Sequence, residues 1–159
     1  MVFILNGTNI TCLIDLLILL VKDKSILKYK NEFDQDLYLL ASKYGDLDIM
    51  EYLEEYHNWD IHVKDFLNYD AYLTACKHGQ LETMKYLEKK HNWDIYVQTV
   101  HENDAYLIAS SNFHLHIMKY LDKEHNWNRK VRNMFGYSAY EYGSDEIREY
   151  LEKSEFYFL

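Results

Sequence analysis

Apolar residues recur along this chain at the spacing of amphipathic helices, in pairs of stretches that a glycine separates. Within residues 70–103, spacings of three and four predict two helices, each with one apolar face. Asp70 can cap the first helix, and Gly79 ends it because a left-handed residue is easiest without a side chain. Residues 94–103 then alternate between polar and apolar, which predicts an extended loop. The apolar positions are Tyr72, Ala75 and Cys76 in the first helix and Leu81, Met84 and Leu87 in the second.

The same pattern returns every 34 residues. A fixed period of this size predicts a solenoid, in which each unit buries its apolar face against its neighbours. We therefore interpret residues 1–159 as one domain of full repeats with a partial unit at each end. The full repeats are 36–69, 70–103 and 104–137, residues 10–35 form an N-terminal half repeat with a second helix and a loop, and 138–159 form a shortened C-terminal cap.

The most apolar segment is the run from Leu13 to Val21, which Asp15 interrupts. It is too short to span a bilayer, which requires roughly 20 residues. No basic residue precedes it and no small-residue cleavage site follows it, so we expect neither a membrane span nor a signal peptide. The run predicts a buried helix at the start of the stack.

The unit of short helix, glycine, longer helix and extended loop resembles the ankyrin repeat. The resemblance covers residues 36 to about 153. This variant of the repeat is similar to the divergent ankyrin repeats of giant DNA viruses of amoebae, of the mimivirus type. It implies a mainly α fold, an ankyrin-like solenoid of short helix-turn-helix repeats joined by extended hairpin-like loops. Tetratricopeptide repeats share the period, but Gly45 and Gly79 leave room for a first helix of only two turns. The resemblance is carried by Tyr72, Leu73, Ala75, Gly79, Leu81, Met84, Lys85, Tyr86 and Leu87.

Most repeating side chains predict packing. The three His-Asn-Trp copies place equivalent atoms about 10 Å apart, too far for one zinc ion with donors at about 2 Å. We expect the tryptophans to stack as a ladder over the second helices, with His and Asn capping the helix ends, and the helix acids to face solvent. Leu47, Leu81 and Leu115 are expected in the core. Two periodic tyrosine series are expected to pack within the stack, Tyr38, Tyr72, Tyr106 and Tyr140, and Tyr52, Tyr86, Tyr120 and Tyr150.

The third repeat departs from the pattern where its first helix ends. Phe113 stands at the position of Gly45 and Gly79. A non-glycine residue in a left-handed conformation costs about 1 kcal/mol. We therefore expect Asn112 to make the turn instead.

Charge and composition narrow the function. The net charge of −9 argues against a nucleic-acid partner, which requires a basic surface. Cys12 and Cys76 form neither a zinc spacing nor a disulfide framework, so a reducing, intracellular compartment fits. No nucleophile, phosphate-binding loop or paired-acid motif occurs. We expect no enzyme activity, no cofactor and no metal.

The loop tips are the candidate binding surface, because they differ between repeats whose framework is nearly constant. They span 64–69, 98–103 and 132–137 and carry apolar residues at positions expected to be exposed. In ankyrin proteins such tips line the binding surface, and an exposed apolar patch without a partner is a liability. Non-periodic tyrosines add further candidates, because tyrosine is enriched in interfaces. The candidate residues are Phe66, Leu67, Val100, His101, Met134, Phe135, Tyr44 and Tyr96.

The sequence therefore predicts a non-enzymatic scaffold that binds another protein through loop tips and exposed helix faces. If the viral resemblance holds, the partner is a host protein and the compartment the host cytoplasm. We expect a monomer that binds neither nucleic acid nor membrane. Two alternatives remain: a subunit or substrate receptor that docks into a larger, ubiquitin-ligase-like assembly through its N-terminal helix, and a structural module that self-associates.

Overall fold

The computed structural model describes residues 3–5, 8–10, 15–16, 19 and 24–155, and it is mainly helical. A short antiparallel strand pair, which the sequence pattern did not predict, precedes the helices, with Ile4 of β1 opposite Asn9 of β2. The elements are β1 (Phe3–Leu5), β2 (Thr8–Ile10), the 3-10 helix η1 (Lys24–Lys28), α2 (Leu37–Tyr44), α3 (Leu47–His57), α4 (Ala71–Lys77), α5 (Leu81–His91), α6 (Ala105–Ser111), α7 (Leu115–His125), α8 (Ala139–Tyr142) and α9 (Asp145–Glu155).

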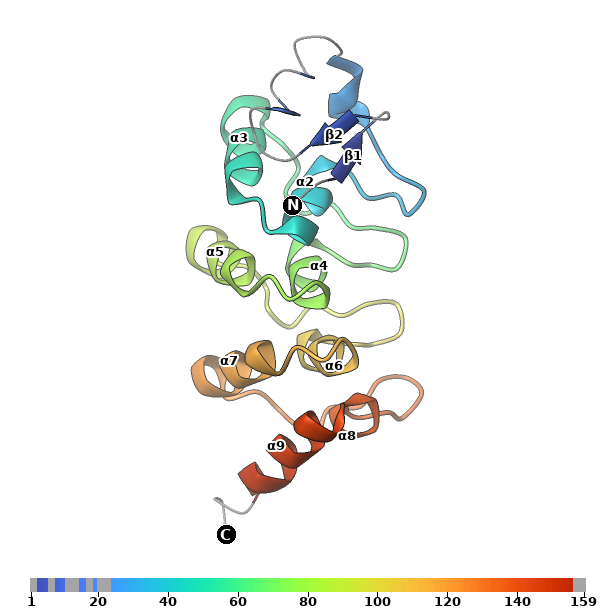
Figure 1. Ribbon diagram of the computed structural model, residues 1–159, viewed down its shortest axis with the longest axis vertical. Coiled ribbons are helices and arrows are strands. Elements are labelled where there is room, and N and C mark those ends of the chain that lie inside the picture. Colours follow the sequence, from blue (N-terminus) through green and yellow to red (C-terminus); the bar gives the residue numbers. More distant parts are fainter. Residues whose placement is uncertain (1–2, 6–7, 11–14, 17–18, 20–23, 156–159) are drawn as a thin grey trace.

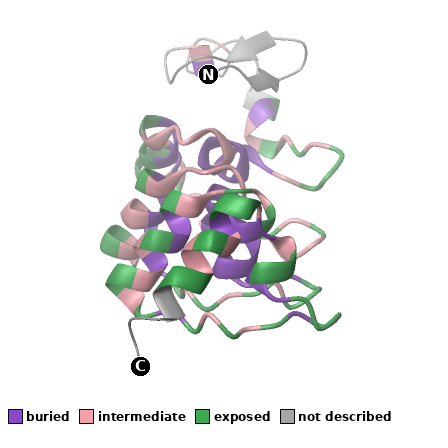
Figure 2. Cartoon of the chain, turned by 60° about the horizontal axis from the view of Figure 1, so that its bottom comes forward, coloured by how far each residue is buried: buried purple, intermediate pink, exposed green. Residues whose placement is uncertain are grey.

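Short and long helices alternate along the chain and lie in two rows. The short helices α2, α4, α6 and α8 follow one another in a row, in which each contacts the next, and α3, α5 and α7 lie beside them (Figure 1). The loops project on the side of the short helices away from the long ones. Buried residues occupy the short helices and the inner faces of the long ones (Figure 2), so the core runs between the rows.

An aspartate begins each short helix of the full repeats and fastens it to a tryptophan of the same repeat. In the second repeat, Asp70 Oδ1 accepts the Leu73 N–H at 2.9 Å, and Oδ2 accepts the indole N–H of Trp93 at 3.1 Å. Burial raises the pKa of the Asp70 carboxyl, although these hydrogen bonds oppose the shift. The equivalent indole bonds join Trp59 to Asp36 at 2.8 Å and Trp127 to Asp104 at 3.1 Å.

Small residues let neighbouring short helices approach closely. Ala75 is fully buried, and the adjacent Cys76 thiol donates to the Ala105 carbonyl of the next repeat at 3.1 Å. The same contact joins Ser42 to Ala71 and Ser110 to Ala139, each at 2.5 Å. Burial raises the pKa of the Cys76 thiol, which keeps it protonated and able to donate.

The expectation that helix acids face solvent is wrong for one acid in each of α3, α5 and α7. Glu88 accepts hydrogen bonds from Tyr72 of its own repeat at 2.8 Å and from Tyr120 of the next repeat at 2.6 Å, and His125 lies 3.1 Å away. A half-buried carboxylate therefore links two repeats. Equivalent links are made by Glu54 with Tyr38 and Tyr86, and by Asp122 with Tyr106 and Tyr150.

The phenol pKa values reflect this arrangement. Burial, together with the hydrogen bond to Asp122, raises the pKa of Tyr150 to about 12. Burial alone would raise the pKa of Glu54, but hydrogen bonds from Tyr38 and Lys90 hold it below its ordinary value. At this link the lowered pKa of Glu54 keeps the carboxylate ionised, and the raised pKa values of Tyr38 and Tyr86 keep both phenols protonated near neutral pH.

Two predictions about the core need correction. The leucines that begin the long helices are only half-buried, because the deepest positions lie two, three and six residues further along each helix. Tyr140 is 44% exposed, because α8 is a single turn and the last described helix of its row, whereas the other three members of its series are fully buried. The deep positions are Ile49, Met50 and Leu53 in α3, Thr83, Met84 and Leu87 in α5, and Ile117, Met118 and Leu121 in α7.

The aromatic ladder differs from the prediction. The indoles are interleaved with side chains from the preceding loop: His62 stacks on Trp93 at 4.9 Å, and Tyr96 stacks on Trp127 at 5.1 Å. The asparagines do end the long helices, because Asn58, Asn92 and Asn126 adopt left-handed conformations with φ of 46°, 49° and 49°. His91 and His125 instead point at the acids of the preceding repeat.

The turn of the third repeat is also a correction. Phe113 itself is left-handed, with φ of 61°, whereas Asn112 has φ of −108°. A β-carbon on Gly79 would lie 3.0 Å from the His114 ring of the next repeat. Phe113 is instead 64% exposed, so its ring extends into solvent and does not meet the next repeat.

Most of the predicted helix from Leu13 to Val21 lies outside the described residues. Asp15, Leu16 and Leu19 are helical, and Leu16 is fully buried. Ile26 of η1 is also buried, and residues 31–35 form a turn like those of the full repeats.

Replacing Asp70 by Asn should destabilise the protein by about 1–3 kcal/mol, although Asn is as good an isolated N-cap as Asp. The asparagine side chain offers one acceptor oxygen in place of two. Either the helix N–H or the Trp93 indole N–H would therefore face the NH2 group of the amide, which is itself a donor. Urea denaturation measures the loss. The matched control is Asp60→Asn, since Asp60 is exposed and accepts only one backbone N–H, from His62. Equal losses in the two variants would show that the indole bond is unimportant.

Phe113→Gly should raise the free energy of unfolding by about 1 kcal/mol, because glycine adopts the left-handed conformation without strain and little buried surface is lost. The control is Asn112→Gly, which removes an amide bonded to the Ile108 carbonyl from a residue with negative φ and should be destabilising. Thermal melts of both variants test the assignment, and a loss of stability in Phe113→Gly would mean that the ring contributes to packing.

Candidate partner-binding surface

Each loop tip is held by one short side chain that accepts two backbone N–H groups. Asp65 Oδ1 accepts from Leu67 and Tyr69, each at 2.9 Å, and the residue between them, Asn68, is left-handed with φ of 66°. This turn is the local reason for the tip shape, because such side chains replace a backbone acceptor. The equivalent acceptors are Asn31, Thr99 and Asn133, and the equivalent left-handed residues are Asp34, Glu102 and Gly136.

Backbone hydrogen bonds join each tip to the next. The Val100 N–H donates to the Leu67 carbonyl at 3.1 Å, and the Met134 N–H donates to the His101 carbonyl at 3.3 Å. The Asn68 amide also donates to the Gln98 carbonyl at 2.6 Å. The three tips therefore form one connected edge rather than independent loops.

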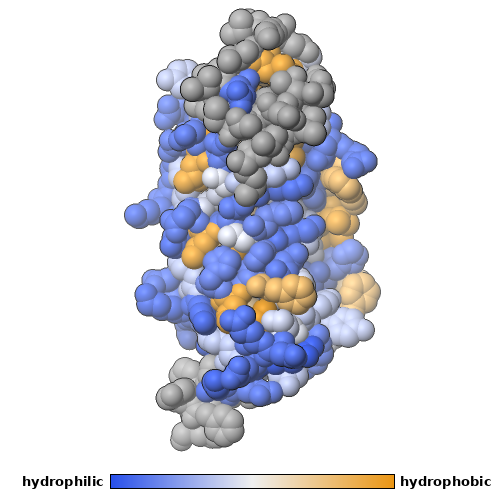
Figure 3. Space-filling model, in the orientation of Figure 1, coloured by the Kyte–Doolittle hydropathy of each residue, from blue (hydrophilic) through white to orange (hydrophobic). Residues whose placement is uncertain are grey.

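Apolar side chains project from this edge. Phe66, Val100, Met134 and Phe135 are 56%, 52%, 55% and 59% exposed. Figure 3 shows hydrophobic side chains along the edge of the molecule on which the loop tips of Figure 1 lie. Scattered exposed apolar residues are ordinary, but here their backbones are joined into one row.

The row continues onto a residue that the sequence analysis missed. Phe33 is 48% exposed and stacks on Phe66, with ring centroids 6.1 Å apart. Tyr137, 51% exposed, extends the other end. The signal was present in the sequence, because Asn31 precedes Asp65 by one period and aligns residues 30–35 with the full tips.

Six of the eight predicted residues lie on the tips, and two do not. Leu67 is half-buried and His101 is exposed, with its ring 5.6 Å from that of Phe135. Tyr44 is at the C-terminal end of α2, away from the tips, and packs against the core. Tyr96 is 66% exposed, but its ring stacks on Trp127 between the long helix and the tip. Both tyrosines therefore have a packing partner within the chain.

The charges along the edge are mixed. Lys64 and Arg132 are positive and Asp65 and Glu102 are negative, so both signs occur between the apolar side chains. Arg132 is held by the Gly136 carbonyl at 2.6 Å and by Glu141 at 3.5 Å. Such an edge favours apolar contact with polar margins over binding of a single-sign polymer.

The described residues contain no group of three or more His, Cys, Asp or Glu side chains that could hold a metal ion. Within the same residues, no helix combines the length and apolar character that crossing a membrane requires. A comparison with protein-family models finds no match, and a comparison with curated proteins finds no significant match.

Thr99 offers a test of the tip turn, because its hydroxyl accepts from His101 and Asn103 over 3.3 and 3.2 Å, longer than the bonds to Asp65. Thr99→Ala should cost about 1 kcal/mol by removing the acceptor of two backbone groups. Thr99→Asn, which copies Asn31 and Asn133, should be neutral or stabilising. Urea denaturation separates the two variants, and a harmless Thr99→Ala would show that the turn forms without its side-chain acceptor.

Proposed function

We propose that this chain is a non-enzymatic, ankyrin-like solenoid that binds another protein through the edge formed by its loop tips. The observation that carries the proposal is the row of exposed apolar side chains on tips that are hydrogen-bonded to one another. Apolar residues contribute to association when a partner removes them from water, and they contribute little to the fold where they are exposed.

The ankyrin assignment rests on three features together. The 34-residue period, the short helix followed by a longer one, and the extended tip between helix pairs occur in the same order in each full repeat. The row of contacting short helices supports a stack that continues from repeat to repeat (Figure 1). In such a stack each repeat is stabilised by its neighbours.

The tips suit binding because little ordering remains to be done. The side-chain acceptor within each tip and the bonds between tips hold the backbone before a partner arrives, which lowers the entropy cost of association. Phe33, Phe66 and Phe135 present large rigid side chains on that backbone. Aromatic anchors of this kind account for much of the binding energy in protein interfaces.

The other parts of the proposal follow from the same reading. The partner is a protein, a host protein if the viral resemblance is real, and the chain acts as a monomer without cofactor, metal, nucleic acid or membrane. A reducing compartment suits the buried, protonated thiol of Cys76.

The combined substitutions Phe66→Ser, Val100→Ser and Phe135→Ser should abolish capture of the partner from a lysate of the cells in which the protein is made. Each exposed side chain is expected to contribute about 1–2 kcal/mol to binding and little to folding. Quantitative mass spectrometry of proteins retained by parent and variant measures capture, and circular dichroism melting measures stability.

Tyr56→Ser is the matched control, because Tyr56 is 71% exposed on α3 and lies outside the tips. Retention of the same proteins by the triple variant would contradict the proposal. Unfolding of the triple variant would show that the tips are structural. Sedimentation velocity tests one further outcome. If the parent self-associates and the triple variant does not, the edge is an interface between copies of this chain.

A further inference from the structure

The outward positions of the long helices change charge in the middle of the chain. The position that holds Glu51 in α3 holds Lys85 in α5 and Lys119 in α7, and the position of Glu55 is taken by Lys89 and Lys123. The framework is the same at these positions, so the change is confined to side chains. It gives two adjacent helices a basic outer face in a chain of net charge −9.

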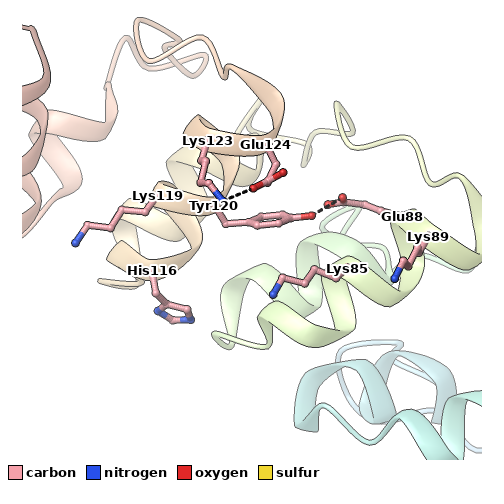
Figure 4. Close-up of a pocket in the computed structure, with 8 residues that line it drawn as sticks. All are labelled: Lys85, Glu88, Lys89, His116, Lys119, Tyr120, Lys123 and Glu124. Carbon is pink, nitrogen blue, oxygen red and sulfur yellow. Dashed lines mark hydrogen bonds and ion pairs between the residues drawn. The ribbon is translucent and has the colours of Figure 1, made fainter. Parts of the chain in front are cut away.

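A groove lies between these two helices. Its volume is about 620 Å³, and Figure 4 shows lysines of both helices around the Tyr120 ring. The Tyr120 hydroxyl donates to Glu88, which holds the ring between the helices. The basic side chains of the lining are Lys85, Lys89, His116, Lys119 and Lys123.

The acids of the groove are already engaged. Glu88 accepts from Tyr72 and Tyr120 and lies beside His125, so its charge is shared within the fold. Glu124 pairs with Lys123 at 2.9 Å, but both side chains are largely exposed, and pairs of this kind are weak. Within the described part of the chain, Lys89 has no ion-pair partner. Lys85 also pairs with the exposed Glu82, which lies outside the lining, at 2.7 Å, and four lysines against two glutamates leave the lining itself with a positive excess.

We infer that this groove binds an acidic segment of a partner protein. Carboxylates fit the ammonium groups, which surround the half-buried Tyr120 ring, with Lys85 Nζ 5.5 Å from the ring centroid. The spacing also fits: lysines four residues apart on one helix lie about 6 Å apart, close to the roughly 7 Å between alternate residues of an extended peptide. Nucleic acid fits poorly, since the rest of the chain would repel it.

The groove is separate from the proposed function. It is formed by the long helices α5 and α7, whereas the tips lie beyond the short helices on the other side of the molecule (Figure 1). If the tip variants still capture the partner, the proposed function is refuted and the groove inference is unaffected. If the groove does not bind the acidic peptide, the groove inference is refuted and the proposed function is unaffected.

Fluorescence anisotropy with a labelled peptide of alternating Glu and Ser tests the inference, and a peptide of alternating Gln and Ser is its uncharged counterpart. The protein should bind the first peptide and not the second, more weakly as salt rises. Lys89→Glu combined with Lys123→Glu should weaken binding by about tenfold or more, because two attractions become repulsions. In amide NMR spectra, the peptide should shift resonances of α5 and α7.

The control is Lys28→Glu combined with Lys130→Glu, which changes the net charge equally at exposed sites outside the groove. Equal weakening in both double variants would overturn the groove in favour of general charge attraction. Absence of binding, or NMR shifts elsewhere, would also overturn it. The helix α9 has five acidic and two basic side chains. If sedimentation shows that the parent self-associates at low salt and the groove variant does not, the occupant is α9 of a second copy, and the proposal fails as stated.

Discussion

The carboxylate that begins each short helix of the full repeats is shared between two parts of the same repeat. One oxygen of Asp70 holds the first turn of α4, and the other holds the indole of Trp93, which stands just after the end of α5. One buried group thus fixes the start of the short helix and the position of the chain just after the long helix. The loop that carries the tip begins after the long helix and ends at the aspartate of the next repeat, so both of its ends are held by carboxylates of this kind. Because burial opposes its ionisation, the carboxylate is stable there only while both donors are present.

Contacts between repeats use a different chemistry from contacts within them. Thiol and hydroxyl groups bond to carbonyls of the next short helix, and Glu54, Glu88 and Asp122 gather tyrosines from two repeats. Polar groups at these junctions have fixed partners at fixed distances, so they specify how far one repeat rotates on the next. An apolar contact alone would tolerate sliding. The stack is therefore positioned by hydrogen bonds and stabilised by burial.

The repeat period and the apolar spacing predicted the helix pairs, their order and the shortened first helix of the last unit, α8. They failed where a side chain acts across repeats. The position of Glu88 on its helix predicts a solvent-exposed acid, because the spacing within one helix gives no information about hydrogen bonds to Tyr72 and Tyr120 of other helices. Phe113 was expected to avoid a left-handed conformation. Open solvent beside it removes only the clash that a side chain at Gly79 would make with His114, while the backbone strain at φ of 61° remains. The tips were identified by their variation, whereas Phe33 was missed because variation between full repeats gives no information about a partial one.

In each tip, the residues that hold the backbone and the residues that face outward are different. Asp65 and Asn68 set the turn and the link to the next tip, while Phe66 between them makes no side-chain hydrogen bond and is open to solvent. The proposed binding residues and the residues that fix the turn therefore occupy separate positions of the same six-residue segment. Under the proposed function, substitution at the outward positions would change the partner without changing the backbone that holds them. The edge would then act as a set of interchangeable side chains on a fixed backbone, in which new specificity requires no new fold.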